Sequence, residues 1–395
     1  MRGSVRKDET RGTWTVVVDN GTDPLTGKRR QLRRRGFTSE RAAHRALGQM
    51  LRDAQTGEYV EPTGQNVSQY VTEWLDTIRP AKDRAGNLTG NIKPATFAQY
   101  ETLLTAYVIP RVGGVPLRAL DAGRLSKLYR TLLESGRRDG TALSARTVEA
   151  THKVVRRALG DAVRWGRLTK NPAEHAEVPR PGHREMRTWD AEQVRAFLDS
   201  VAEHRLRAAY HVAFMTGLRR GELLGVQWAD INFDRAQLAV RRNRVAVGYD
   251  VSEGSPKTGR ARTIALDPAT VTELRAHRKR QLEERLAWGD AWTETGFVFV
   301  LESGEPIHPQ TFTYWFDRAV AATDLPRIRL HDVRHTHATL GLAAGVPAKV
   351  MAERLGHANV SITLDLYSHV TETLQVDAAA RVAATVFGTP TAEVL

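Results

Sequence analysis

The sequence contains no cysteine among its 395 residues. This absence excludes disulfide scaffolds, cysteine-based zinc sites, iron–sulfur clusters and thiol nucleophiles, so any nucleophile must be an oxygen or a nitrogen atom. Long apolar runs are missing too: none approaches the roughly 20 residues that a membrane-spanning helix needs, and residues 1–11 are basic and polar. We therefore expect a soluble, intracellular protein without a membrane partner.

Acidic residues are the minority among the charged ones, with 45 Asp and Glu against 58 Lys and Arg. The net charge is +13 and the pI is near 10.2. Such an excess favours a polyanionic partner, although on charge alone ribosomal, membrane-surface and DNA-binding proteins all remain open. The length predicts two or three domains rather than one.

The first predicted domain, residues 1–62, is a small basic module made of a sheet and a helix. Its first 60 residues hold 13 Lys or Arg against 7 Asp or Glu. Residues 14–19 and 28–37 are typical of strands on either side of a turn, and Ser39 is a typical N-cap of a helix. The second strand carries a basic run that fits a DNA groove but can equally be a solvated edge. This run consists of Lys28, Arg29, Arg30, Arg33, Arg34 and Arg35.

The second predicted domain, residues 63–178, is all-α. Helical periodicity covers residues 67–78, 93–108, 121–135 and 144–165, and few residues suit a sheet. Side chains of the types that hold phosphates are spread over these helices, although in a helical bundle they can equally be plain surface. They are Thr96, Tyr100, Arg118, Lys127, Arg146, Thr147, Lys153, Arg156 and Arg157. Proline, glycine and charged residues then indicate a linker at 179–187.

The third predicted domain, residues 188–395, is mainly α with a small antiparallel sheet. Its patterns indicate helices near 190–203, 206–226 and 309–322, a hairpin between 237 and 266, and a short strand at 297–300. The fold class that follows for the whole chain is multidomain α+β.

Five short segments of the third domain each hold a residue suited to phosphate chemistry. In the first, a glycine breaks one helix and Arg219 opens the next, with Glu222 one turn on, where it can orient the guanidinium. Alone this pair is no more than a surface ion pair. In the second, Lys257 lies among turn residues, a position that is usually solvent-exposed. The remaining segments are His331-Asp332-Val333-Arg334-His335, Leu355-Gly356-His357 and Leu366-Tyr367.

The histidine-rich segment invites a metal hypothesis that its neighbours oppose. His331 and His335 have the four-residue spacing that zinc sites use, but the glutamate of the zinc-protease motif is missing and Arg334 would repel a dication. On a helix these three residues share one face, where a cation beside two imidazoles suits an anionic oxygen. We therefore expect a phosphate here, no metal and no cofactor.

Taken in order, the motifs resemble the catalytic signature of the tyrosine recombinase, or phage integrase, family. They are Thr216-Gly217-Leu218-Arg219, then Lys257, then His331 to His337, then Leu355-Gly356-His357 and finally Tyr367. The resemblance is densest between residues 216 and 368, whereas the first two domains fit the family's modular plan with less specific residues. It implies a site-specific recombinase, and the basic N-terminal module favours the integrase of a phage or other mobile element that holds arm-type DNA sites.

The resemblance also implies a mechanism. Tyr367 would attack the scissile phosphate and form a 3′-phosphotyrosyl bond. Arg219, Arg334 and His357 would bind the phosphate oxygens, with Glu222 supporting Arg219. Lys257 would protonate the leaving 5′-oxygen, and His331 would assist proton transfer around the tyrosine. Strand exchange would pass through a Holliday junction without metal or ATP.

The same resemblance implies the partners. They are double-stranded DNA with core and arm-type attachment sites, further copies of the chain in a tetramer, a DNA-bending accessory protein and an excision directionality factor. The setting would be the cytoplasm of a bacterial host, on the nucleoid. In this family the C-terminal tail often docks on a neighbour, and an apolar stripe suits that role or packing on its own domain. The stripe is Leu374, Val382, Val386 and Phe387.

Three alternatives remain open at this point. A type IB topoisomerase shares phosphotyrosine chemistry, but the compact five-part spacing and the module order favour the integrase group. A DNA-binding or architectural protein without chemistry would be expected to lack Tyr367 or one of the arginines. A metal-dependent nuclease would need clustered carboxylates, and near the histidines only Asp332 and Glu353 are available.

Overall fold

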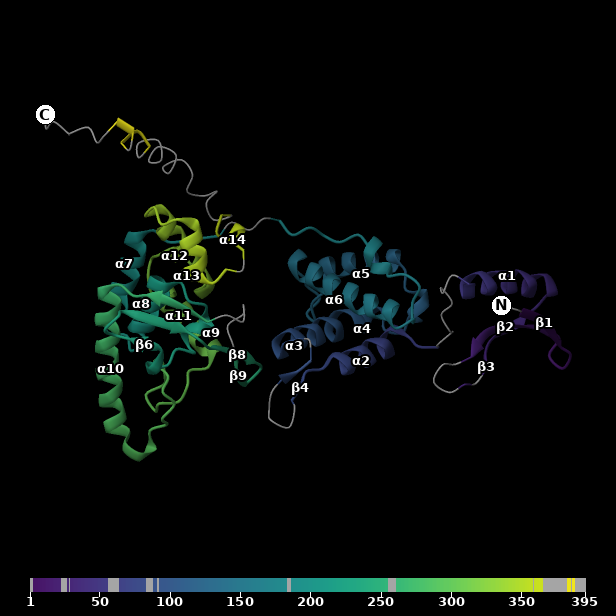
Figure 1. Cartoon of the computed structure of the whole chain (residues 1–395), viewed down its shortest axis with the longest axis horizontal. Helices are drawn as coiled ribbons and strands as arrows, with labels where there is room; N and C mark the ends of the chain where they lie inside the picture. The colour runs from purple at the N-terminus through teal and green to yellow at the C-terminus, as the bar shows by residue number, and fades with distance from the viewer. Residues whose placement is uncertain are drawn as a thin grey trace. The chain divides into compact units, whose positions relative to one another are not determined.

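The computed structural model describes residues 3–22, 27, 29–55, 64–82, 88–90, 92–182, 186–254, 261–357, 359–364, 382–384 and 386–387. The chain forms two compact units, Met1–His183 and Arg184–Leu395 (Figure 1). Among the described residues, none of the helices has both the length and the apolar character that crossing a membrane requires.

The N-terminal module of the first unit is a three-stranded antiparallel sheet with one helix. Strands β1 (Gly3–Asp8), β2 (Thr13–Thr22) and β3 (Arg29–Phe37) lie in the order β1-β2-β3, and α1 (Glu40–Gln55) follows (Figure 1). The hydroxyl of Ser39 accepts a hydrogen bond from the Ala42 amide at 3.3 Å, as its predicted role as N-cap requires. The small core consists of Val16, Val18, Leu32, Ala43 and Met50.

Strand β1 was not predicted, because its residues are mostly polar and only Val5 packs against this core. The strand is held instead by backbone pairing along β2, where Val5 lies opposite Val16. The sequence therefore indicated two strands where the structure has three.

The remainder of the first unit is helical. Its helices are α2 (Val67–Ile78), α3 (Pro94–Leu103), a π-helical turn (Leu104–Val108), α4 (Ile109–Val112), α5 (Ala122–Ser135) and α6 (Ala145–Arg164). Short 3-10 turns lie at Leu117–Ala119 and Pro172–His175, and strands β4 (Ala81–Lys82) and β5 (Leu88–Thr89) form one small ladder. The predicted starts of three helices agree with caps at Asn66, Asp121 and Ser144, whose side chains accept from the third amide of each helix.

The helical core is built around large aromatic residues. Tyr70, Trp74 and Tyr129 are almost fully buried. Trp74 donates its ring N–H to the buried carboxylate of Asp161 at 2.7 Å, so that a polar atom of α2 is satisfied by α6.

The second unit surrounds a small sheet with helices. The helices are α7 (Ala191–Ser200), α8 (Arg207–Thr216), α9 (Arg220–Leu223), α10 (Pro268–Trp288), α11 (Pro309–Ala321), α12 (Leu330–Ala343), α13 (Ala348–Leu355) and α14 (Ser361–Leu364). Strands β6 (Ile231–Asn232), β7 (Gln237–Val240) and β10 (Arg262–Ala265) form an antiparallel sheet in the order β10-β7-β6, and β8 (Asn243–Val247) pairs with β9 (Asp250–Gly254). The described residues of this unit also include 3-10 turns at Trp228–Asp230 and Gly289–Ala291.

Two sequence predictions for this unit were wrong in detail. The predicted hairpin between 237 and 266 is divided in the structure: β7 ends at Val240 and pairs with β10, while β8 pairs with β9 in a separate hairpin. The segment 297–300 does not form the predicted strand. It makes two isolated bridges, from Phe297 to Gln227 and from Val300 to Pro306. Its valines and phenylalanines are nevertheless buried, which is what their sequence pattern reflects.

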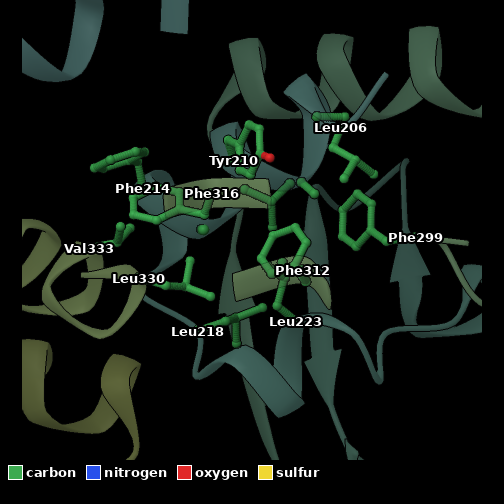
Figure 2. Close-up of a cluster of buried hydrophobic side chains, with 14 of the residues drawn as sticks. Leu206, Tyr210, Phe214, Leu218, Leu223, Phe299, Phe312, Phe316, Leu330 and Val333 are labelled. Carbon is green, nitrogen blue, oxygen red and sulfur yellow. The ribbon is translucent and has the colours of Figure 1, made fainter. Parts of the chain in front are cut away.

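The core of the second unit fixes the elements that carry the motifs. Figure 2 shows Phe214 and Phe316 in one cluster with Leu218, Leu223, Leu330 and Val333. Leu218 and Leu223 lie on either side of Arg219 in the chain, and Leu330 and Val333 directly precede His331 and Arg334. Arg219, His331 and Arg334 are thus each next to a buried residue of this core, which limits their movement.

Candidate active site

The junction between α8 and α9 places Arg219. Gly217 ends α8 in the left-handed region, with a φ of 62°, and Arg219 is the N-cap of α9. A Cβ at position 217 would lie 2.6 Å from Cδ2 of Leu355 and 2.8 Å from Cδ2 of His337. Glycine is therefore required both by the backbone conformation and by the close approach of α12 and α13.

A buried carboxylate holds Arg219. Glu222 is 1% exposed; it accepts from Nη1 of Arg219 at 2.9 Å and from the Arg219 amide at 3.1 Å. Its other partner is Arg262 of β10, whose Nη1 and Nη2 donate to the two carboxylate oxygens at 3.2 and 2.7 Å. Burial raises the pKa of Glu222, but the hydrogen bonds and charges of Arg262 and Arg219 outweigh it and hold the pKa below its usual value.

Three arginines converge on the C-terminal end of α13. Nε of Arg262 donates to the carbonyl of Arg354 at 3.0 Å. Nη2 of Arg334 donates to the carbonyl of Leu355 at 2.6 Å, and Nη2 of Arg219 donates to the carbonyl of Gly356 at 3.2 Å. The last carbonyls of a helix have no partner within it and carry its negative dipole end, so they suit cationic donors. We call these three carbonyls, of residues 354, 355 and 356, the carbonyl triplet.

Arg334 is the most enclosed of the three arginines. It is 4% exposed, and its Nη1 donates to the carbonyl of Gly217 at 2.9 Å. Burial and the charge of Arg219 lower the pKa of Arg334 to about 9, which leaves it charged at neutral pH. The α8–α9 junction and the end of α13 are thereby joined through a single guanidinium.

The histidines around the arginines are neutral at pH 7. Desolvation and the charges of Arg334 and Arg219 lower the pKa of His357 to about 4. Desolvation and the charge of Arg334 also lower the pKa of His331, whose ring lies 5.0 Å from that of His335. Beyond burial, which is the larger cause, the charge contributions agree with a local excess of positive charge, since three guanidiniums face one carboxylate. Such a place favours an anionic oxygen, as in a phosphate.

His337, the third histidine of the motif, has a structural position. Its Nδ1 bonds the carbonyl of Phe214 at 2.8 Å, and its Nε2 accepts from Nε of Arg354 at 3.3 Å. Arg354 also donates to the carbonyls of Ala265 and Met215 at 2.9 and 3.0 Å. His337 and Arg354 therefore tie α13 to α8 and β10.

Sequence reasoning missed Arg262 and Arg354. Arg262 lies two and four residues before the buried Ile264 and Leu266. Alternate residues of a strand face the same side, so this spacing was the available signal that Arg262 points inward. No comparable pattern marks Arg354, which lies on a short helix among other charged residues.

Two predicted residues, Lys257 and Tyr367, lie outside the described residues. Within the part of the chain that the structure describes, no group of three or more His, Asp or Glu side chains is arranged to hold a metal ion. The described site thus offers guanidiniums and imidazoles that can bind a phosphodiester, and main-chain carbonyls that orient the guanidiniums.

The helical domain brings several predicted DNA-contact residues together. Arg157 of α6 donates to the Tyr100 hydroxyl of α3 at 3.1 Å, and its guanidinium lies 5.4 Å from that ring. Arg146, Lys153 and Arg157 are exposed and follow one side of α6. Lys153 also pairs with Glu149 at 2.6 Å. Thr147 is half-buried, with its amide bonded to the Ser144 hydroxyl, and Thr96 is half-buried on α3.

In the N-terminal module the basic run is divided between two faces of β3. The register places Arg33 opposite Val17 but Arg34 opposite the buried Val16, and Arg35 follows near a bulge. All three are exposed, and Arg33 donates to Gln31 at 2.9 Å. Lys28 and the side chains of Arg29 and Arg30 lie outside the described residues.

Two family models match the chain. The model of the phage integrase family matches residues 187–373, which include the whole arginine and histidine site. A model described as an arm DNA-binding domain matches residues 4–54, which form the N-terminal sheet and most of α1.

Relatives with known names agree with these matches. A tyrosine recombinase XerC-like protein of Caldanaerobacter subterraneus is 32% identical over 298 residues, covering 70% of this chain and 75% of that protein. An integrase of Streptomyces ambofaciens is 29% identical over 379 residues, covering 92% of this chain and 91% of that protein.

Solved structures share the fold. The Tn1549 transposon integrase in complex with a circular intermediate DNA has a TM-score of 0.67 at 20% identity, covering 81% of this chain and all of that one. A lambda integrase tetramer bound to a Holliday junction has a TM-score of 0.58 at 18% identity, covering 92% and 94%. The family match and the 32% identical relative establish that the chain belongs to the phage integrase family of tyrosine recombinases.

Proposed function

We propose that this site-specific recombinase is the integrase of a phage or other mobile element, with Tyr367 as nucleophile and Arg219 and Arg334 as the groups that bind the scissile phosphate. One observation carries the proposal for the arginines. Their guanidiniums donate to adjacent carbonyls, of Gly356 and Leu355, and are thereby fixed side by side before any DNA arrives. Fixed donors stabilise charge that builds up in a transition state at little reorganisation cost.

The strand cleavage that we propose replaces one phosphoester bond with another. The Tyr367 oxygen bonds to phosphorus, the bond from phosphorus to the 5′-oxygen breaks, and a 3′-phosphotyrosine is left. Lys257 gives its proton to the 5′-oxygen. His331 takes up the tyrosine proton, which its lowered pKa permits because the ring is neutral at pH 7.

Strand joining reverses these steps with the 5′-hydroxyl of a partner strand. The phosphotyrosine keeps the energy of the broken bond, so neither ATP nor metal is required. His357 would add a hydrogen bond to the same phosphate. Two rounds of exchange, each by one pair of protomers in a tetramer, would pass through a Holliday junction. The lambda integrase tetramer on such a junction supports this stage by its shared fold.

The domains would share the work on DNA. We propose an arm-type binding module at 1–62, a core-site domain at 63–178, a linker at 179–187, and a catalytic domain with its tail at 188–395. Exposed Arg146, Lys153 and Arg157 on α6 would contact core-site phosphates, with Thr96, Tyr100 and Thr147 beside them. Arg33, Arg34 and Arg35, together with Lys28, Arg29 and Arg30, would contact arm-type DNA.

Further partners follow from the reaction. An integrase that holds arm and core sites together needs bent DNA, so we propose a DNA-bending accessory protein and a directionality factor for excision. We propose that the protein acts in the cytoplasm of a bacterial host, on the nucleoid, because its DNA substrate lies there.

Covalent capture tests this function. The protein is mixed with fragmented DNA of host and element, denatured and recovered, and the attached ends are sequenced, with Tyr367→Phe as control. The expected result is a 3′ end linked at a few loci, absent from the control. If no DNA survives denaturation with either protein, the chain is a DNA binder without strand-transfer chemistry.

A further inference from the structure

A third arginine belongs to the active site although none of the five sequence motifs contains it. We propose that Arg262 is a positioning residue that aligns the guanidinium of Arg219 with the scissile phosphate. The inference rests on the proposed function, in which Arg219 binds that phosphate.

Arg262 contacts both groups that hold Arg219. One of them is Glu222, which accepts from Arg219 at 2.9 Å and from both terminal nitrogens of Arg262. The other is the end of α13, where Arg219 donates to the carbonyl of Gly356 and Arg262 to that of Arg354. Arg262 therefore braces Arg219 through a carboxylate on one side and through the main chain on the other.

The geometry leaves little freedom to this brace. The side chain of Arg262 is 12% exposed and that of Glu222 is fully buried. A Cβ at Gly356 would lie 2.9 Å from Nη1 and 3.0 Å from Cζ of Arg262. The main chain of α13 thus passes directly over the guanidinium, which the glycine permits.

Charge balance explains why Arg219 needs the brace. Without Arg262, the buried Glu222 would have Arg219 as its main cationic partner. Losing one guanidinium leaves buried negative charge uncompensated, and we expect Glu222 to compensate by drawing Arg219 into a bidentate pair. Such a pair would pull Nη2 of Arg219 away from the carbonyl of Gly356. The charge of the Arg219 guanidinium would then be neutralised by Glu222 instead of by the DNA phosphate.

Lysine cannot replace Arg262 in this role. The guanidinium donates from Nε, Nη1 and Nη2 to three acceptors in one plane, whereas an ammonium is a single point charge. Arg262→Lys therefore keeps the charge and removes the alignment.

The chain offers a matched control in Arg205. This arginine is 20% exposed, makes a bidentate pair with Glu284 at 2.8 and 2.6 Å, and donates to the carbonyl of Val300. It has the same kinds of partners as Arg262 in the same unit, but it touches neither Glu222 nor the carbonyl triplet in these contacts. Arg205→Lys should lower the melting temperature and leave the cleavage rate unchanged.

The test is single-turnover cleavage of a nicked duplex built on a crossover site recovered by covalent capture, at saturating protein. Each variant is compared with the unsubstituted protein on a normal scissile phosphate and on a methylphosphonate, which lacks the oxygen charge that Arg219 would meet. We expect Arg262→Lys to slow cleavage of the phosphate by about 10- to 100-fold. The dissociation constant for DNA should stay unchanged. On the methylphosphonate, the logarithm of the fold-decrease in cleavage rate should be at most half of its value on the normal phosphate.

A merely structural role gives a different pattern. An unchanged rate for Arg262→Lys, or an equal defect on both substrates, would overturn the positioning role. If Arg262→Lys does not fold, the double variant with Arg262→Gln and Glu222→Gln takes its place, because it leaves no unpaired charge in the interior, and it should cleave more slowly than the unsubstituted protein. A wild-type rate in that double variant would also overturn the proposal. Absence of cleavage by the unsubstituted protein would instead contradict the proposed function itself, and this role with it.

Discussion

Nη2 of Arg334 lies 2.6 Å from the carbonyl oxygen of Leu355, while its Nη1 donates to Gly217 on the other side. One guanidinium thus joins α12, the α8–α9 junction and α13. An ammonium cannot span both carbonyls with a planar fork. We expect Arg334→Lys to lower the rate of covalent complex formation by about 100-fold or more while DNA is still bound. Gel shift and covalent capture on the same site separate the two effects, and a rate within threefold of wild type would contradict this role.

The left-handed backbone conformation of Gly217 forms the junction that places Arg219 in the site. Ala at this position would have to adopt a φ of 62° and place its Cβ 2.6 Å from Leu355. We expect Gly217→Ala to lower the free energy of unfolding by about 2–4 kcal/mol, because strain and overpacking add. Urea denaturation measures this change. Gly248→Ala, at a φ of 63° with open space around its Cβ, is the control and should cost less.

Acid should destabilise the second unit through His337. Burial and the charge of Arg354 lower its pKa to about 4 from the ordinary 6.5. Between these two pH values the unfolded state binds more protons than the folded state, so stability falls as the pH falls from 6.5 towards 4. Asn at this position can keep the bond to the Phe214 carbonyl without titrating. Melting temperatures of His337→Asn should therefore depend less on pH in this window, and identical pH profiles would argue against the assignment.

DNA affinity should depend on the exposed side of α6. If Arg157 contacts a phosphate, Arg157→Gln should weaken binding at all sequences alike and reduce the slope of log affinity against log salt by about 1. Arg130→Gln is a suitable control, since Arg130 is an exposed arginine of α5 that lies 4.0 Å from Glu177. Equal salt slopes for the wild type and Arg157→Gln would exclude the contact.

Chelation separates the recombinase from a metal-dependent nuclease. Excess EDTA should leave the yield of covalent complex unchanged, because arginines supply the positive charge that metal ions supply in such nucleases. A loss of activity that Mg²⁺ restores would show that a metal takes part in the reaction.

Sequence patterns predicted the elements of this protein best where local signals were strong. The capped helices at 67–78, 122–135 and 145–164 agree with the expected ranges to within one residue at every end. Strand β1 was missed because pairing with β2, rather than its own composition, forms it. The break between β7 and β8 falls at Arg241 and Arg242, and it was missed because the composition of a segment does not show where pairing changes partner.

The residue types of the candidate site could be predicted from the sequence, but their hydrogen-bond partners could not. The motifs singled out Arg219, Arg334 and His357 because chemistry requires those side chains. Their acceptors are main-chain carbonyls of α13, which no residue type marks in a sequence. Arg262 was overlooked for the same reason, since its role appears only once Glu222 and the end of α13 are seen beside it.

The carbonyl triplet has a consequence for how this site changes over generations. Its acceptor atoms belong to the main chain, so a codon change at 354 or 355 alters a side chain but never removes the oxygen that the arginine binds. Insertion or loss of one codon between 352 and 354 would rotate the end of α13 that follows by about 100° and displace all three acceptors together. The alignment of the arginines therefore depends on the length and path of the main chain. In this short segment, insertions and deletions should impair the site much more than substitutions do.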